Sequence, residues 1–143
     1  MNIIKISKDF NEYPGLRNCS ISDYSGEEFY HRILNPAFKR CFENNKQLIV
    51  DLDGTGGYAS SFLDEAFGNL IYDFSLACVY NAIQIISLEE PHWKKMIEKE
   101  TFPQWDERRL KNEAPKVTKN HDAWFRLVNG ELINKVWEQP PVV

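Results

Sequence analysis

The stretch that decides the fold is residues 48–74, LIVDLDGTGGYASSFLDEAFGNLIYDF. Its first five residues, Leu48–Leu52, are a compact apolar run of the kind found in strands that are covered on both faces of a parallel sheet. The residues 61–74 then keep helical apolar spacing, with Asp64, Glu65, Asn69 and Asp73 expected to face away from the core. A second apolar run follows at Ala82–Ile86. Strand, helix and strand at this spacing predict a right-handed βαβ unit with the two strands as parallel neighbours.

The segments before this unit predict one strand and one helix. Asn2–Ser7 carries three isoleucines and is expected to be a short strand, followed by a loop or a loose hairpin over residues 8–24. Ser25 and Glu28 have the spacing of a capping box, which indicates a helix that begins after Ser25. Pro36 lies inside that helix, so we expect a kink or a break there.

The segments after the unit predict a helix, a charged connector and a hairpin. Pro91 stands where a helix could begin. The residues 104–122 are rich in charge and poor in apolar side chains, which is typical of a surface helix or connector. Residues 123–137 form two runs around Asn129-Gly130, a pair that favours a tight hairpin turn. In that register Leu127 faces Leu132. We expect the opposite face, with Trp124, Arg126, Glu131, Ile133 and Lys135, to be mixed and exposed, the alternative being a partner surface.

Together these elements predict an α/β fold: a mixed sheet with packed helices and a C-terminal β-hairpin extension. A chain of 143 residues fits a single domain. We therefore expect an α/β core over residues 1–102, with residues 103–143 forming a charged connector and a hairpin packed on the same domain.

Composition narrows the classes of function. The net charge of −4 argues against a protein that follows nucleic acid, which would be basic. The three cysteines, Cys19, Cys41 and Cys78, form no C-x-x-C pair, and the three histidines lie far apart. We therefore expect no metal site, no cofactor and a reducing, cytoplasmic location. No apolar run approaches the length of a membrane span.

One motif suggests an enzyme. A strand that ends in Asp51-Leu52-Asp53-Gly54-Thr55 resembles the first motif of haloacid dehalogenase-like phosphatases. That resemblance would make Asp51 the nucleophile and Asp53 the general acid and base, with Mg²⁺ at the phosphate. The lysine and the later Gly-Asp acidic pair of that family are missing, so the phosphatase is the alternative interpretation.

A longer resemblance covers roughly residues 1–100. Residues 50–68, VDLDGTGGYASSFLDEAFG, are similar to the signature of the STAS-like family of bacterial proteins. Residues 14–17, PGLR, and residues 25–29, SGEEF, match further pieces of that family in the same order. The segment after Pro103 carries no such resemblance. The resemblance implies a STAS-like fold and a regulatory, protein-binding role rather than an enzyme.

The STAS-like family is similar in fold to anti-sigma-factor antagonists, in which a kinase partner phosphorylates a serine at the corresponding loop. That serine falls on Ser60, with Ser61 next, although Ala59 and Phe62 replace the usual aspartate and glycine. The resemblance implies a histidine-kinase-like ATPase as the kind of partner. The partner-binding loop and helix would then be built by Asp53, Gly54, Thr55, Gly56, Gly57, Tyr58, Asp64 and Glu65.

The residues of the loop allow two simpler interpretations. A glycine-rich loop before a helix leaves amide groups free, so the same place could hold a small anion or a nucleotide as a sensor. Alternatively, Ser61 with Asp64 could be a plain S-x-x-D cap of the helix.

Overall fold

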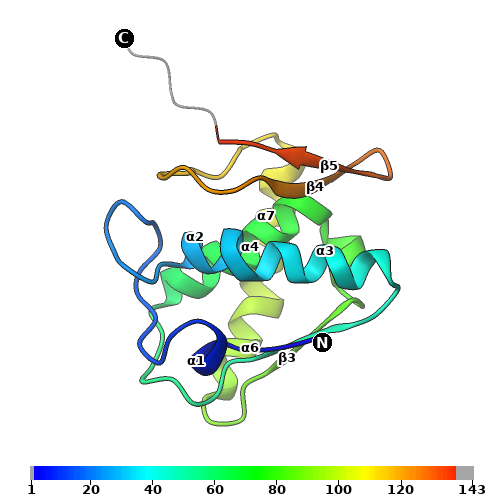
Figure 1. Cartoon of the computed structure of the whole chain (residues 1–143). Helices are drawn as coiled ribbons and strands as arrows, with labels where there is room; N and C mark the ends of the chain where they lie inside the picture. The colour runs from blue at the N-terminus through cyan, green and yellow to red at the C-terminus, as the bar shows by residue number, and fades with distance from the viewer. Residues whose placement is uncertain (1, 138–143) are drawn as a thin grey trace.

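The computed structural model describes residues 2–137 (Figure 1). Its main sheet contains β1 (Ile3–Lys5), β2 (Leu48–Asp51) and β3 (Ile83–Ile86) in the order β1-β2-β3. Both pairs of neighbours are parallel. The predicted parallel pairing of the two apolar runs is therefore confirmed. Within residues 2–137 the sheet is parallel throughout rather than mixed, because antiparallel pairing is confined to the separate C-terminal hairpin.

The predicted βαβ unit is present. Helix α4 (Ser60–Phe74) and the short α5 (Leu76–Val79) connect β2 to β3. Phe67 and Leu70 of α4 are fully buried in the core, as the helical spacing predicts.

The first helical region is interrupted next to Pro36. The first strand is shorter than predicted: it ends at Lys5, and a single helical turn, α1 (Ile6–Asp9), follows it directly. Ser25 caps α2 (Gly26–Phe29), and its side chain accepts the Glu28 amide at 3.1 Å. A π-turn, η1 (Tyr30–Leu34), then leads into α3 (Asn35–Glu43). Pro36 has no amide hydrogen and occupies the first turn of α3, so the predicted break takes the form of a wide turn before it.

The second helical region runs without a gap from residue 91 to residue 110. It consists of α6 (Pro91–Met96), the π-turn η2 (Ile97–Thr101) and α7 (Phe102–Leu110). The expected division after residue 102 therefore lies inside a continuous helical segment. Helices α4 and α7 approach closely at Gly68, where an added Cβ would lie 2.1 Å from Trp105 Cε2. None of the helices within residues 2–137 is long and apolar enough to cross a membrane.

The described residues, 2–137, cover the sheet on one face only. In Figure 1 helices α2, α3, α4 and α7 lie between the sheet and the hairpin, so the hairpin adds a third layer instead of covering the second sheet face. Burial alternates along β2 and β3: Leu48, Val50, Ile83 and Ile85 are buried, whereas Ile49 and Ile86 are half-buried and Gln84 is exposed. The expectation of strands covered on both faces is therefore wrong. We call the uncovered side, with Ile3, Ile49, Gln84 and Ile86, the open face.

The hairpin consists of β4 (Trp124–Val128) and β5 (Glu131–Lys135). Asn129 and Gly130 both have positive φ, and Leu127 pairs with Leu132, as predicted. The expected mixed, exposed face is found at Glu131 and Ile133, which are exposed. The expectation is wrong for Trp124 and Arg126, because Trp124 is buried and Arg126 forms an ion pair with Asp73 of α4.

The C-terminal segment also explains the polar side of α4. Glu65, Asn69 and Asp73 were expected to face away from the core, but all three are buried. Arg126 Nε donates to Asp73 at 2.6 Å, and the Tyr30 hydroxyl donates to the same carboxylate at 2.5 Å. Helix α4 is thus the centre of the molecule, and its polar stripe bonds to neighbouring elements rather than to solvent.

Candidate functional site

The predicted loop Asp53–Tyr58 lies at the carboxyl end of β2 and is fixed by the loop after β3. The Asp53 carboxylate accepts the amides of Leu88 and Glu89 at 3.1 and 3.0 Å. In return, the Glu89 carboxylate accepts the Gly54 amide at 2.6 Å. Each loop therefore satisfies amides of the other, and the pair has one well-defined shape.

The base of the loop is held as firmly. Asp51 forms an ion pair with Lys5 at 3.1 Å and accepts the Asp53 amide at 2.9 Å. The Tyr58 hydroxyl donates to the Leu52 carbonyl at 2.6 Å, and burial raises the pKa of Tyr58 above its usual value. Gly54 and Gly57 have φ values of 92° and 128°, which other residues adopt only with strain.

These contacts bear on the phosphatase alternative. The Asp51 and Asp53 carboxylates are engaged in loop contacts, and neither belongs to a group of three side chains that could hold a metal within the described residues. The geometry therefore gives no support to a Mg²⁺-dependent phosphatase at this loop.

Ser60 and Ser61 occupy the first turn of α4. Ser60 is exposed and Ser61 is half-buried. The N-cap is Ala59, which offers no side-chain cap. The interpretation of Ser61 and Asp64 as an S-x-x-D cap is wrong, because the helix already includes Ser60, and Asp64 instead accepts hydrogen bonds from Arg17, Thr101 and Trp105.

The helix side of the predicted site is covered. Glu65 is buried, and its carboxylate accepts from Arg17 at 3.1 Å and from Asn69 at 2.8 Å. Burial raises the pKa of Glu65 above its usual value, although the bonds from Asn69 and Arg17 oppose this shift. The expectation that the exposed side of α4 offers a partner surface is wrong beyond its first turn. Asp64 and Glu65 are contacted there by Arg17, Asp64 also by Thr101 and Trp105, and Asp73 by Arg126 of β4.

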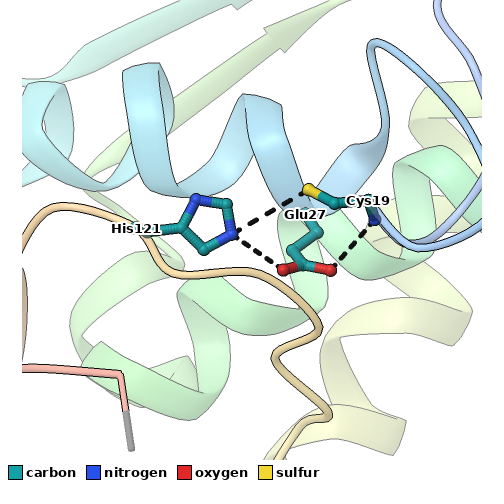
Figure 2. Close-up of side chains that lie close together, drawn as sticks. All are labelled: Cys19, Glu27 and His121. Atoms are coloured by element: carbon teal, nitrogen blue, oxygen red, sulfur yellow. Dashed lines mark hydrogen bonds and ion pairs between the residues drawn. The ribbon is translucent and has the colours of Figure 1, made fainter. Parts of the chain in front are cut away.

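A second cluster joins three segments that the sequence separates. Figure 2 shows Cys19 from the loop before α2, Glu27 from the first turn of α2, and His121 from the segment before β4. His121 Nε2 lies 2.7 Å from Glu27 Oε2 and 3.9 Å from Cys19 Sγ. One ligand atom from each of the three side chains lies within 4.8 Å of the others. Sequence reasoning missed this cluster because Cys19 and His121 are 102 residues apart and share no motif.

Glu27 is the hub of the cluster. Its Oε1 accepts the Thr118 hydroxyl at 2.6 Å and the Cys19 amide at 3.1 Å, and its Oε2 accepts the Thr118 amide at 3.0 Å. Burial opposes ionisation of Glu27, but the hydrogen bonds from His121 and Thr118 outweigh it and lower its pKa to about 2. The Glu27 carboxylate thus connects the loop before α2, at Cys19, and the segment before β4, at Thr118 and His121, to helix α2.

The cluster does not have the geometry of a cysteine nucleophile and its base. Both the thiol and the carboxylate approach the same ring nitrogen of His121, so the carboxylate cannot orient the ring from the opposite nitrogen. Burial also raises the pKa of Cys19 to about 11, which keeps the thiol protonated.

His31 lies directly beside the cluster. Its ring stacks on His121 with a centroid separation of 4.2 Å, and burial lowers its pKa to about 3. Within residues 2–137, neither ring nitrogen of His31 has a hydrogen-bond partner. His31 and His121 both line a cavity of about 360 Å³, together with Arg32 and Lys119.

Comparison with known proteins assigns the family. Residues 25–93 match the family described as a STAS-like domain of unknown function. No curated protein and no solved structure gives a significant match. The matched range runs from the Ser25 cap through β2, the loop Asp53–Tyr58, α4 and β3 to the start of α6. Residues 25–93 of this chain therefore belong to the STAS-like domain family.

Proposed function

We propose that this chain is a non-enzymatic regulatory module that binds a protein partner through the loop Asp53–Tyr58 and the side chains around it. A STAS-like domain suggests such a role. The observation that carries the proposal is the apolar surface left open around a rigid loop. Tyr13 is 73% exposed and lies against Gly56, while Leu88 is 81% exposed and its amide binds Asp53.

The open face of the sheet offers further apolar area. Parallel sheets are normally covered on both faces, yet here Ile3 is 52% exposed, and Ile49 and Ile86 are half-buried. Exposed apolar area next to a pre-shaped loop favours association, because ordering the loop costs little free energy on binding.

Charge indicates the chemistry of the partner. Glu12, Glu89 and Glu90 are exposed around the loop, and Asp53 is half-buried there. A complementary surface would combine apolar side chains with lysine or arginine. The resemblance to anti-sigma-factor antagonists suggests a histidine-kinase-like ATPase as the partner, and this chain would then act by partner switching in the cytoplasm.

Ser60 and Ser61 are the proposed phosphate acceptors. Both line a hollow of about 200 Å³ with Arg17, Asp64 and Glu100. A phosphate there would meet the free amides of the first turn of α4, which helix termini offer to anions. It would also lie close to the carboxylates of Asp64 and Glu100. Repulsion between these negative charges would change the shape of this edge of the surface and so weaken binding of the partner.

The proposal is tested by titrating the purified chain with a histidine-kinase-like ATPase from the same genome, by calorimetry. We expect Tyr13→Ser combined with Leu88→Ser to weaken binding at least 10-fold. Tyr80→Ser is the matched control, because Tyr80 is 64% exposed but lies before β3, at the opposite end of the strand from Leu88. Equal binding by the double variant and wild type, or equal loss in the Tyr80 variant, would reject the surface.

A second titration tests the serine. Ser60→Glu should weaken the same binding, because the added charge lies beside the carboxylates of Asp64 and Glu100 and their repulsion alters the edge that the partner meets. The melting temperature should stay unchanged, since negative charge is tolerated at the start of a helix. Ser60→Gln, which adds similar bulk without charge, is the control. Equal binding by all three forms would remove the phosphorylation part of the proposal and leave the surface itself unaffected.

A further inference from the structure

We propose that Cys19 Sγ, Glu27 Oε2 and His121 Nε2 form a zinc-binding site. The three atoms come from three different segments and converge on one point, as Figure 2 shows. This inference does not depend on the proposed partner surface, because the cluster lies on other elements.

The kinds of ligand select the metal. Thiolate, imidazole and carboxylate are the three protein ligands of zinc, whereas Mg²⁺ and Ca²⁺ prefer oxygen ligands alone. On binding, the ion displaces the proton of the Cys19 thiol to solvent. The resulting thiolate and the Glu27 carboxylate together balance the charge of a divalent ion, with His121 neutral. A buried site then carries no net charge, which avoids the cost of an unpaired charge in the interior.

The distances are close to those of a tetrahedral ion. Ideal zinc bonds place a nitrogen and an oxygen ligand roughly 3.3 Å apart and a sulfur and a nitrogen ligand roughly 3.6 Å apart. The corresponding separations here are 2.7 Å between His121 and Glu27 and 3.9 Å between Cys19 and His121. The third separation, between Cys19 Sγ and the Glu27 oxygen, is at most 4.8 Å, so side-chain shifts of about 0.5–1 Å would accommodate the ion between the three atoms.

Glu27 keeps its supporting contacts in this arrangement. Oε1 accepts from the Thr118 hydroxyl and the Cys19 amide, so Oε2 can turn toward the metal while Oε1 remains bonded. Bonded carboxylates of this kind fix the orientation of metal ligands. The ion would replace the direct contact between His121 and Glu27 with two metal–ligand bonds.

His31 supplies an independent observation. It is 7% exposed, and within residues 2–137 both of its ring nitrogens lack a partner, although buried polar groups are almost always hydrogen-bonded. A water in the fourth position of a three-ligand zinc site, on the side of the cavity that His31 and His121 line, would give His31 a partner.

The site would join the first loop, α2 and the segment before the hairpin. Zinc would therefore clamp the C-terminal part of the chain to the STAS-like domain. A three-ligand site with one position open can bind and release its ion more readily than a closed four-ligand site, which makes this clamp responsive to available zinc.

The test titrates the full chain, stripped of metal, with Zn²⁺ against a chromophoric chelator, and with Co²⁺ while recording its absorption. We expect one Zn²⁺ per chain and, with Co²⁺, the charge-transfer absorption of a cobalt–thiolate bond. Cys19→Ser should lose that absorption and weaken Zn²⁺ binding by more than about 100-fold, since loss of even an outer partner of a metal ligand costs about 10–100-fold.

Matched controls separate this site from other thiols and histidines. Cys78→Ser and His92→Gln should bind Zn²⁺ as wild type does, because Cys78 and His92 lie outside the cluster. Glu27→Gln could unfold the chain, so the decision rests on Cys19→Ser and His121→Gln, with circular dichroism to confirm that both fold. Zn²⁺ binding that persists in Cys19→Ser, or that Cys78→Ser abolishes, would overturn the proposal, as would a Co²⁺ complex without thiolate absorption.

Discussion

Replacing Arg126 by methionine would isolate the buried carboxylate of Asp73. The Asp73 side chain is 2% exposed, and Arg126 Nε donates to it at 2.6 Å while its guanidinium lies over the Tyr72 ring. Removing one partner of a buried ion pair costs about 3–5 kcal/mol. Arg126 is 23% exposed, so solvent screens part of its contribution, and we expect a loss of about 2–4 kcal/mol at pH 7.

The assay is urea unfolding followed by tryptophan fluorescence. Burial raises the pKa of Asp73 even with Arg126 present, and loss of Arg126 would raise it further. The destabilisation of Arg126→Met should therefore shrink as the pH falls, because the isolated carboxyl takes up a proton and no longer carries a buried charge. Adding Asp73→Asn to Arg126→Met should recover part of the loss for the same reason.

The matched control is Arg109→Met. Arg109 pairs with Asp106 at 3.0 Å, but that pair is more exposed, so its loss should cost less than about 1 kcal/mol. Equal costs for the two arginine variants, or a loss below about 1 kcal/mol for Arg126→Met, would refute the reasoning that this pair anchors the hairpin to α4.

Two further predictions concern packing and pH. Gly68→Ala should destabilise the chain by about 1–3 kcal/mol in the same assay, because the new Cβ would lie 2.1 Å from the Trp105 ring. The same substitution should cost less stability in a Trp105→Leu background. A neutral or stabilising effect of Gly68→Ala would contradict this packing. With EDTA present, stability should fall as the pH drops from about 6.5, because the unfolded chain protonates His31 there while the folded chain resists protonation down to about pH 3. Glu27 contributes to the loss of stability in acid only below about pH 4.5, because its pKa in the folded chain is about 2. His31→Phe should therefore flatten the plot of stability against pH between pH 6.5 and 4.5. An unchanged slope in that range would contradict the burial of a neutral His31.

The elements that depend on local pattern were predictable from the sequence. The apolar runs, the helical stripe of α4, the Ser25 cap and the Asn129-Gly130 turn each depend on residues close in the chain, and each is found where expected. The break near Pro36 follows from the missing amide of proline, although the sequence does not distinguish a π-turn from a kink.

The features that depend on long-range contacts were not predictable. Glu65, Asn69 and Asp73 have the spacing of a solvated helix face, but they are buried, and distant segments supply partners to Glu65 (Arg17) and to Asp73 (Tyr30 and Arg126). The open face of the sheet was expected to be covered, but it is partly exposed. A compact isoleucine-rich strand does not reveal where the remaining helices pack. The cluster of Cys19, Glu27 and His121 likewise exists only once the segment before β4 crosses α2.

The central claim is that a protein partner binds the rigid loop Asp53–Tyr58 and its apolar surroundings. Hydrogen exchange of the chain, alone and saturated with a histidine-kinase-like ATPase, tests it most directly. We predict that the amides of residues 53–58 and 88–89 gain protection on binding, while those of the hairpin residues 124–135 do not change. Protection confined to the hairpin or to α7, with the loop unchanged, would contradict the account.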